Sequence, residues 1–227
     1  MPQRFAPVLS ELAPLVPRFR DAGFKLFLVG GTVRDLMLDR SIDELDFDLT
    51  TDALPEQIKS LLAGWCDSLW TQGEKFGTIG AKKGDRVFEI TTHRAEAYSP
   101  DSRKPDVQFS KDINEDLSRR DFTINAMALE ITNESPELVD PFNGLADLMG
   151  KVLRTPLSPE VSFSDDPLRM MRAARFISGL GMIAVPELIA AVQAMADRIT
   201  IVSAERIRDE FDRLIVTDRP SFGLWFL

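Results

Sequence analysis

The sequence predicts an α+β protein, in which a small mixed or antiparallel sheet flanked by helices precedes an all-helical segment. Two observations carry this prediction. The first half contains four short apolar runs rich in β-branched and aromatic residues, which is typical of strands. From about Ser158 onward, apolar residues instead recur three and four positions apart, which is typical of helices. The 227 residues fit one large domain or two small ones, and we expect a boundary between regions 1–150 and 151–227.

The first region is expected to alternate strands and helices. Val33–Leu38 has helical periodicity, and Pro55–Ala63 is a second expected helix with its proline in the first turn. Residues 82–86 contain a Gly-Asp pair, which favours a tight hairpin turn. The four predicted strands are Lys25–Val29, Leu45–Thr50, Thr78–Ala81 and Val87–Thr92.

The middle of the chain changes character twice. Residues 95–116 hold two prolines and many charges, and we expect a mobile loop there. Residues 117–131 are largely apolar and are predicted to form a buried helix. The remaining predicted helices are Pro167–Gly179, Pro186–Ala196 and Ala204–Ile215.

Composition narrows the functional class. A formal net charge of -9 argues mildly against a nucleic-acid binder, although a local basic face would suffice for binding. One cysteine, Cys66, leaves no disulfide partner within the chain, and together with the single His93 it excludes a zinc site built from several His and Cys. The sequence has no signal-peptide core and no apolar run of about 18 residues, so we expect a cytoplasmic protein without a membrane partner. The last residues, SFGLWFL, are apolar, and we expect the polypeptide to continue in a longer parent.

Two aspartates sit one residue apart in a predicted strand. Asp46 and Asp48 therefore share a face, while Phe47 and Leu49 point to the other. Carboxylates so close repel each other unless a cation lies between them, and Mg²⁺ prefers oxygen ligands. Two such ions can hold both the attacking and the leaving oxygen of a phosphoryl transfer. The alternative is an acidic strand face that only meets solvent.

Glu89, on a neighbouring predicted strand, is a candidate third carboxylate at this site. The alternative is a salt bridge from Glu89 to Arg94 or Lys25.

A glycine pair follows the first predicted strand and precedes a helix. At Gly30 and Gly31 the backbone can approach a ligand closely, and the helix N-terminus presents free N–H groups to an anion. Arg34 lies in the first turn, where a cation is unfavourable unless an anion such as a triphosphate is near. The alternative is a tight turn in which Arg34 pairs with Asp35 or Asp39.

Five segments in chain order resemble the motifs of the polymerase β-type nucleotidyltransferases. More narrowly, they resemble the bacterial-type (class II) tRNA nucleotidyltransferases, the CCA-adding enzymes, and their poly(A) polymerase relatives. The first motif is LVGGTVRD followed by DFDLTT, and the second, RRDFTINAMA, is long and highly specific. The others are LVDPFNGLADL, DDPLRMMRAARF and SAERIRDEFDRLI. The resemblance implies a nucleotidyltransferase head followed by a helical neck that begins the RNA-binding region.

The resemblance also assigns residue roles. It makes Asp46 and Asp48 the metal ligands and places Gly31 and Arg34 on the triphosphate. The remaining implied nucleotide-binding residues are Arg120 and Asp121 at the sugar and phosphates, Asp166 and Arg169 as the pair that reads the base, and Arg172 and Arg175. The family commonly has Glu where this chain has Asp165, a side chain one methylene shorter.

The arginines of the fourth motif are spaced by three and share one broad helix stripe. Such a row of cations either faces an anion or forms ion pairs with Asp165, Asp166 and Glu205. An Asp and an Arg together offer acceptors and donors that match the edge of cytosine or adenine. They could therefore select a nucleotide without a nucleic-acid template.

The activity implied by the resemblance is transfer of CMP and AMP from CTP and ATP to the tRNA 3′ end, with two Mg²⁺ ions and release of pyrophosphate. A poly(A) polymerase, or an enzyme adding only CC or only A, is the alternative. TQGEKFGTIGAK stands where bacterial poly(A) polymerases tend to have a basic run, which favours CCA addition. A non-catalytic RNA-binding remnant is a third possibility, and the intact aspartate pair argues against it.

Overall fold

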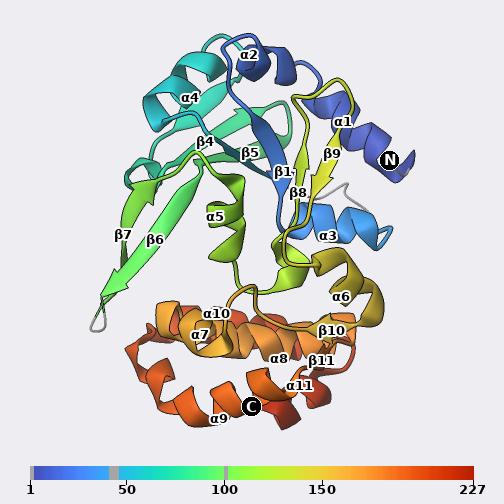
Figure 1. Cartoon of the computed structure of the whole chain (residues 1–227), viewed down its shortest axis with the longest axis vertical. Helices are drawn as coiled ribbons and strands as arrows, with labels where there is room; N and C mark the ends of the chain where they lie inside the picture. Colours follow the sequence, from blue (N-terminus) through green and yellow to red (C-terminus); the bar gives the residue numbers. More distant parts are fainter. Residues whose placement is uncertain (1–2, 41–45, 100–101) are drawn as a thin grey trace. The chain divides into compact units, whose positions relative to one another are not determined.

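The computed structural model describes residues 3–40, 46–99 and 102–227, and they form two compact units (Figure 1). Each unit draws on more than one stretch of the chain. The first comprises Met1–Ala95, Val107–Leu117 and Asn125–Pro141, and the second comprises Glu96–Asp106, Ser118–Ile124 and Phe142–Leu227.

The first unit is built on a sheet in which seven strands are described, in the order β3-β4-β5-β2-β1-β8-β9. Its β2–β5 pair is parallel, while the pairs on either side are antiparallel. Figure 1 shows β1, β8 and β9 side by side. The strands are β1 Leu26–Val29, β2 Phe47–Thr51, β3 Ser68–Trp70, β4 Thr78–Lys83, β5 Arg86–Thr92, β8 Ala128–Glu130 and β9 Glu137–Val139.

Helices pack on this sheet through its apolar side chains. The whole of β1 is buried, and α2, α3 and α4 all contact sheet strands. Helix α4 starts where predicted because Pro55 occupies its first turn and Gln57 Oε1 accepts the Leu54 N–H at 2.8 Å. The helices of this unit are α1 Ala6–Leu12, α2 Val16–Arg20, α3 Gly31–Met37, α4 Pro55–Leu62 and α5 Ile113–Ser118.

The four predicted strands and the hairpin turn between β4 and β5 are confirmed, although Lys25 and Asp46 lie just before β1 and β2 and Leu45 lies outside the described residues. The loop predicted over 95–116 is wrong. Strands β6 Arg94–Ser99 and β7 Ser102–Phe109 pair with each other there, and α5 follows. Every strand of a two-stranded sheet is an edge strand, and an edge tolerates the proline that suggested a loop.

The buried helix predicted over 117–131 is also wrong. Helix α5 ends at Ser118, a 3-10 turn spans Thr123–Asn125, and β8 then pairs with β1. All three residues of β8 are buried, so its apolar run has no alternation. Such a run fits a buried strand as well as a helix, and pairing with β1 decides the outcome.

The second unit is mainly helical, as predicted for the region after Ser158. Helix α8 contacts α7, α10 and α11 (Figure 1). The three predicted helices are confirmed as α8 Leu168–Leu180, α9 Pro186–Met195 and α10 Ala204–Ile215. The structure adds the helices α6 Gly144–Gly150, α7 Pro159–Asp165 and α11 Pro220–Phe226, and the short parallel strands β10 Val152–Leu153 and β11 Ile183–Ala184.

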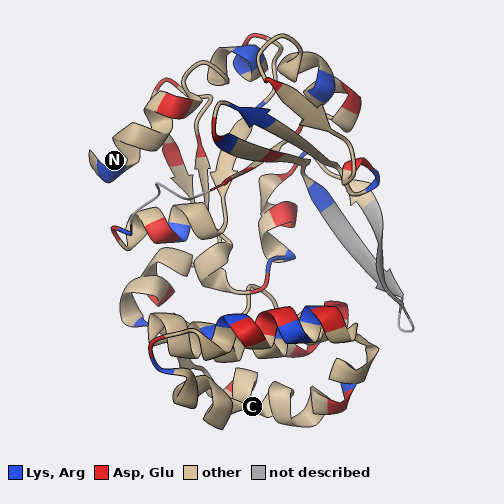
Figure 2. Cartoon of the chain, turned by 180° about the vertical axis from the view of Figure 1, so that it is seen from behind, with Lys and Arg blue, Asp and Glu red and all other residues tan. Residues whose placement is uncertain are grey.

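The exposed surface of the second unit has no uniform sign of charge on α10. Figure 2 shows acidic and basic residues intermingled along that helix. A mixed face does not supply the basic stripe that contacts with phosphates require. Within the described part of the chain, no helix has the length and apolar character needed to cross a membrane.

Candidate functional site

Three carboxylates share one face of the sheet in the first unit. We call Asp46, Asp48 and Glu89 the acidic face. Asp46 immediately precedes β2, and Asp48 lies directly opposite Glu89 in the parallel β2–β5 register. All three are exposed, whereas Phe47 and Leu49, between and beside the aspartates, are 0% and 1% exposed. The predicted division of this strand into an acidic and an apolar face is therefore what the structure shows.

The electrostatics of the acidic face suit a cation. Partial burial raises the pKa of Glu89, and the charges of Asp48 and then Asp46 raise it further. The negative charges of Asp46 and Asp48 thus repel the negative charge of Glu89. Among the described residues, no three His, Cys, Asp or Glu side chains gather closely enough to enclose a metal ion. Two carboxylates fit Mg²⁺ nonetheless, because that ion usually keeps substrate phosphates and waters as its other ligands.

The raised pKa of Glu89 predicts a pH-dependent stability. The fold disfavours the ionised form of Glu89. The resulting loss of folding stability is therefore absent below the ordinary pKa of a glutamate and develops as pH rises through the raised pKa of Glu89. We expect Glu89→Gln to raise the melting temperature of the metal-free protein at about pH 8 and to change it little at about pH 4. Thermal melts in a chelator measure this, with the exposed Glu137→Gln on β9 as control. A lower melting temperature for Glu89→Gln at the higher pH would contradict the prediction.

The glycine pair lies at the end of β1, beside the beginning of β2. Gly30 has φ of 68° and ψ of -134°, a conformation that is accessible essentially only to glycine. It allows α3 to begin at Gly31, so the helix N-terminus opens directly after the strand. The antiparallel register Leu28↔Leu49 brings this turn next to the strand that carries Asp48.

Arg34 is held in place within the first unit. Its Nε and Nη2 donate to the two carboxylate oxygens of Asp35 at 3.0 and 2.7 Å, and its Nη1 donates to Asn125 Oδ1 at 2.5 Å. The ion pair with Asp35, which was the alternative considered for Arg34, is therefore present. The guanidinium also packs against Gly31, since a Cβ there would lie 3.4 Å from Nη2. Arg34 is thus ordered beside the glycine turn with 12% of its side chain exposed.

We call Arg169, Arg172 and Arg175 the arginine stripe, and they lie on α8 in the second unit. Arg172 donates through Nε to Asp121 Oδ2 at 2.9 Å, and Arg175 pairs with Glu210 of α10. Arg120 is partly buried and precedes Asp121 in the chain. The structure therefore brings Asp121 and Arg172 together. It also brings together Arg175 of the fourth motif and Glu210 of the fifth.

Burial and charge act oppositely on these two arginines. The Asp121 charge raises the pKa of Arg172, while burial lowers the pKa of Arg175 despite its contact with Glu210. Glu210 is only 4% exposed, and Arg172 Nη1 lies 3.9 Å from its Oε2. Ion pairing was one of the alternatives for the stripe, and the structure pairs Arg172 with Asp121 and Arg175 with Glu210.

Asp166 and Arg169, the expected base-reading pair, have separate hydrogen-bond partners. Arg169 is 8% exposed and donates through Nη1 to Ser162 Oγ at 2.9 Å and through Nη2 to the Arg119 carbonyl. Asp166, between α7 and α8, accepts from the Leu168 N–H at 3.2 Å and from Arg206 at 2.7 Å. Both side chains are thereby held at the start of α8.

Two residues that order this arrangement were not singled out from the sequence. Asn125 anchors Arg34, and Glu210 anchors Arg175. Asn125 is part of the second motif, but only its distance from Arg34 in space reveals its role. Glu210 had a signal, because it follows Ile207 by three positions and precedes Leu214 by four, which places an acid on an apolar helix stripe.

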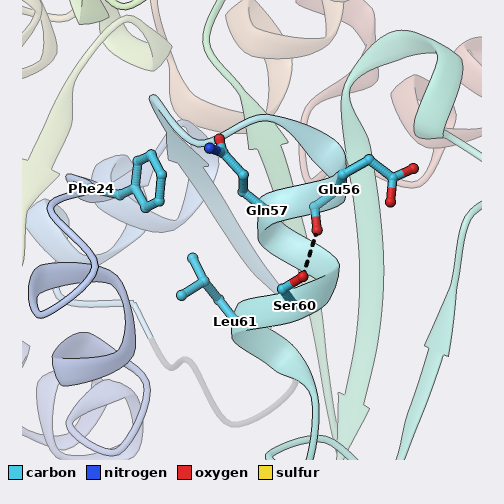
Figure 3. A pocket seen from close by; sticks show the side chains of 5 residues that line it. All are labelled: Phe24, Glu56, Gln57, Ser60 and Leu61. Carbon is cyan, nitrogen blue, oxygen red and sulfur yellow. Dashed lines mark hydrogen bonds between the residues drawn. The ribbon is translucent and has the colours of Figure 1, made fainter.

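A separate hollow of about 280 Å³ lies between Phe24 and the exposed side of α4 (Figure 3). Its polar groups serve the helix itself, since Ser60 Oγ donates to the Glu56 carbonyl at 3.1 Å. Gln57 forms the cap of the same helix. We therefore do not assign this hollow to nucleotide binding.

The fold is that of a nucleotidyltransferase head followed along the chain by a helical region. Residues 26–154 match the family described as Poly A polymerase head domain, and residues 184–225 match the family described as Probable RNA and SrmB-binding site of polymerase A. The chain therefore belongs to the poly(A) polymerase head domain family, and the expected membership of this superfamily is confirmed.

Individual relatives agree with this assignment. The CCA-adding enzyme of Lactobacillus helveticus is 41% identical over 91% of this chain and 50% of its own length. The Bacillus stearothermophilus CCA-adding enzyme in complex with CTP matches 100% of this chain and 52% of its own, with a TM-score of 0.84 at 31% identity. The Thermotoga maritima CCA-adding enzyme complexed with tRNA-CCA matches 96% of this chain and 50% of its own, with a TM-score of 0.78 at 26% identity. The chain spans about half the length of these relatives.

Proposed function

We propose that this chain carries the catalytic part of a CCA-adding tRNA nucleotidyltransferase. It would transfer CMP and AMP from CTP and ATP to the 3′ end of tRNA and release pyrophosphate. The acidic face of β2 and β5, adjoining the glycine turn of β1, is the observation that carries the proposal. The similarity to CCA-adding enzymes named with CTP and with tRNA-CCA supports the choice of substrates.

In this proposal Asp46 and Asp48 would hold two Mg²⁺ ions, which would supply charge stabilisation to the α-phosphate. Glu89 adds negative charge beside them. The N–H groups at Gly30 and Gly31 and the guanidinium of Arg34 would bind the triphosphate.

The second unit would select the nucleotide. Asp166 and Arg169 carry the acceptors and donors for the base edge, and their hydrogen bonds fix them at the start of α8. Arg120, Asp121, Arg172 and Arg175 would form the surrounding polar shell. We propose a catalytic head over 1–150, a helical neck over 151–227, and a cytoplasmic location.

Incorporation assays test the proposal. The chain is incubated with Mg²⁺ and tRNAs that end before, within or after CCA, and labelled CTP and ATP are supplied singly and together. We expect two CMP additions followed by one AMP, and no addition to a complete CCA end. Long tails made from ATP alone would instead identify a poly(A) polymerase. RNA binding without incorporation would identify a non-catalytic module and overturn the proposal.

A further inference from the structure

An aromatic side chain stands in line with the acidic face. The strand registers place Trp70 opposite Gly80, Gly80 opposite Glu89, and Glu89 opposite Asp48. Residues directly opposite each other project from the same side of a sheet. One row of positions across β3, β4, β5 and β2 therefore begins with an indole and ends with the carboxylates.

The missing side chain at Gly80 gives the indole its place. A Cβ at position 80 would lie 2.0 Å from Trp70 Nε1 and 2.1 Å from its Cε2. The ring of Trp70 thus extends from the edge strand β3 over β4, in the direction of Glu89. Trp70 nevertheless remains 36% exposed, so part of a large aromatic surface is presented to solvent.

The spacing matches a short stretch of nucleic acid. Neighbouring strands lie about 4.8 Å apart, so Gly80, beneath the indole, is roughly 10 Å from Asp48 across two strand spacings. That separation is comparable to the reach of one nucleotide. If a base stacks on Trp70, the 3′ end of its own nucleotide, or of the next nucleotide, would lie at the acidic face.

The sheet order indicates which substrate would lie there. β1, with the glycine turn proposed to bind the triphosphate, flanks β2 on one side, and β5, β4 and β3 lie on the other. The incoming nucleotide and the RNA acceptor must reach the acidic face from different directions. With the triphosphate beside β1, the β4–β3 side remains for the acceptor.

The connection between β3 and β4 has the composition of a surface for single strands. Phe76 is 37% exposed, and Lys75 Nζ lies 4.8 Å from its ring centroid. Phe109 is 44% exposed and adjoins this connection, since a Cβ at Gly77 would lie 2.8 Å from its ring. Exposed aromatic rings interspersed with cations are typical of proteins that stack the bases of single strands.

We propose that Trp70 is a stacking surface for a base at the single-stranded 3′ end of the RNA acceptor. This inference rests on the proposed function, because it takes the acidic face as the point of reaction. Trp70 does not touch the reacting atoms. It positions the acceptor.

Steady-state kinetics with a tRNA that lacks CCA and with CTP test the inference. We expect Trp70→Ala to raise the KM for the tRNA by about 5- to 150-fold, the loss that follows removal of one base–aromatic stack. The KM for CTP and the kcat at saturating tRNA should stay close to those of the unchanged chain. Trp70→Phe should restore most of the affinity, because it keeps an aromatic ring.

Leu69→Ala is the matched control. Leu69 is the preceding residue of β3, is equally 36% exposed, and points to the opposite face of the strand. It should leave the KM for tRNA unchanged. A rise in the KM for CTP but not for tRNA, or equal effects of Leu69→Ala and Trp70→Ala, would overturn the assignment of Trp70.

Binding of the same tRNA, measured by fluorescence anisotropy without nucleotide, separates the two proposals. Weaker binding by Trp70→Ala in a chain that incorporates nothing would retain the RNA site while the proposed catalytic function fails. Normal incorporation with unchanged tRNA binding by Trp70→Ala would retain the function and overturn the site.

Discussion

Replacing Asp48 by asparagine is expected to lower nucleotide incorporation by at least about 1000-fold, which corresponds to about 4 kcal/mol of transition-state stabilisation. An amide would remove the charge that we propose holds the divalent ion, while the backbone of β2 and its pairing with β5 remain. Asp48 lies between two buried residues of that strand, so the side chain has no core position to vacate. The loss should therefore appear in kcat rather than in folding.

Single-turnover incorporation of CMP measures the effect of Asp48→Asn, with melting temperatures recorded in parallel. Asp85→Asn, in the exposed turn between β4 and β5, is the matched control and should retain full activity. Activity of Asp48→Asn within tenfold of the unchanged chain would show that the acidic face does not hold a divalent ion needed for the reaction. A large fall in melting temperature would show that the loss arises from folding instead.

Replacing Arg175 by methionine is expected to destabilise the second unit by about 3 kcal/mol, the typical cost of removing one partner from a buried ion pair. Arg175 is the close partner of Glu210, whose side chain is 5% exposed. Without Arg175, that carboxylate either stays charged in an apolar setting or takes up a proton, and both outcomes cost stability. Urea unfolding followed by circular dichroism measures the change.

The double variant Arg175→Met with Glu210→Leu should recover most of this loss, because no charge is then left buried. Arg213→Met, at an exposed position of α10, provides the control and should change the free energy of unfolding little. If Arg175→Met alone were as stable as the unchanged chain, Arg172 would have to satisfy Glu210 without its neighbour. If the double variant were no better than the single one, the loss would stem from packing rather than charge.

The residues of the acidic face and the glycine turn were the easiest to place from the sequence. Asp46 and Asp48 follow a strict alternation with Phe47 and Leu49, and the observed burial has the same alternation. The turn at Gly30 was equally predictable, because an apolar strand ends just before it and a helix begins just after it. Local periodicity and turn chemistry sufficed for both features.

Features that depend on distant partners were not predictable in this way. The apolar run of β8 became a strand only because β1 is beside it, and the proline-containing stretch of β7 is a strand only because β6 pairs with it. Likewise, spacing put Arg169, Arg172 and Arg175 on one stripe, but their partners come from other segments. The sequence pattern predicts which side chains share one face of a strand or helix. It does not identify the residues of other segments that contact this face.

The parallel pairing of β2 with β5 has a consequence for how the site comes into existence. Parallel neighbours cannot be joined by a tight turn, so Asp48 and Glu89 meet only after the intervening α4, β3 and β4 have crossed over and docked. Closing that long loop is an entropic cost that precedes the contact. A partly folded chain therefore lacks the complete acidic face, because Glu89 joins Asp46 and Asp48 only when the sheet is completed.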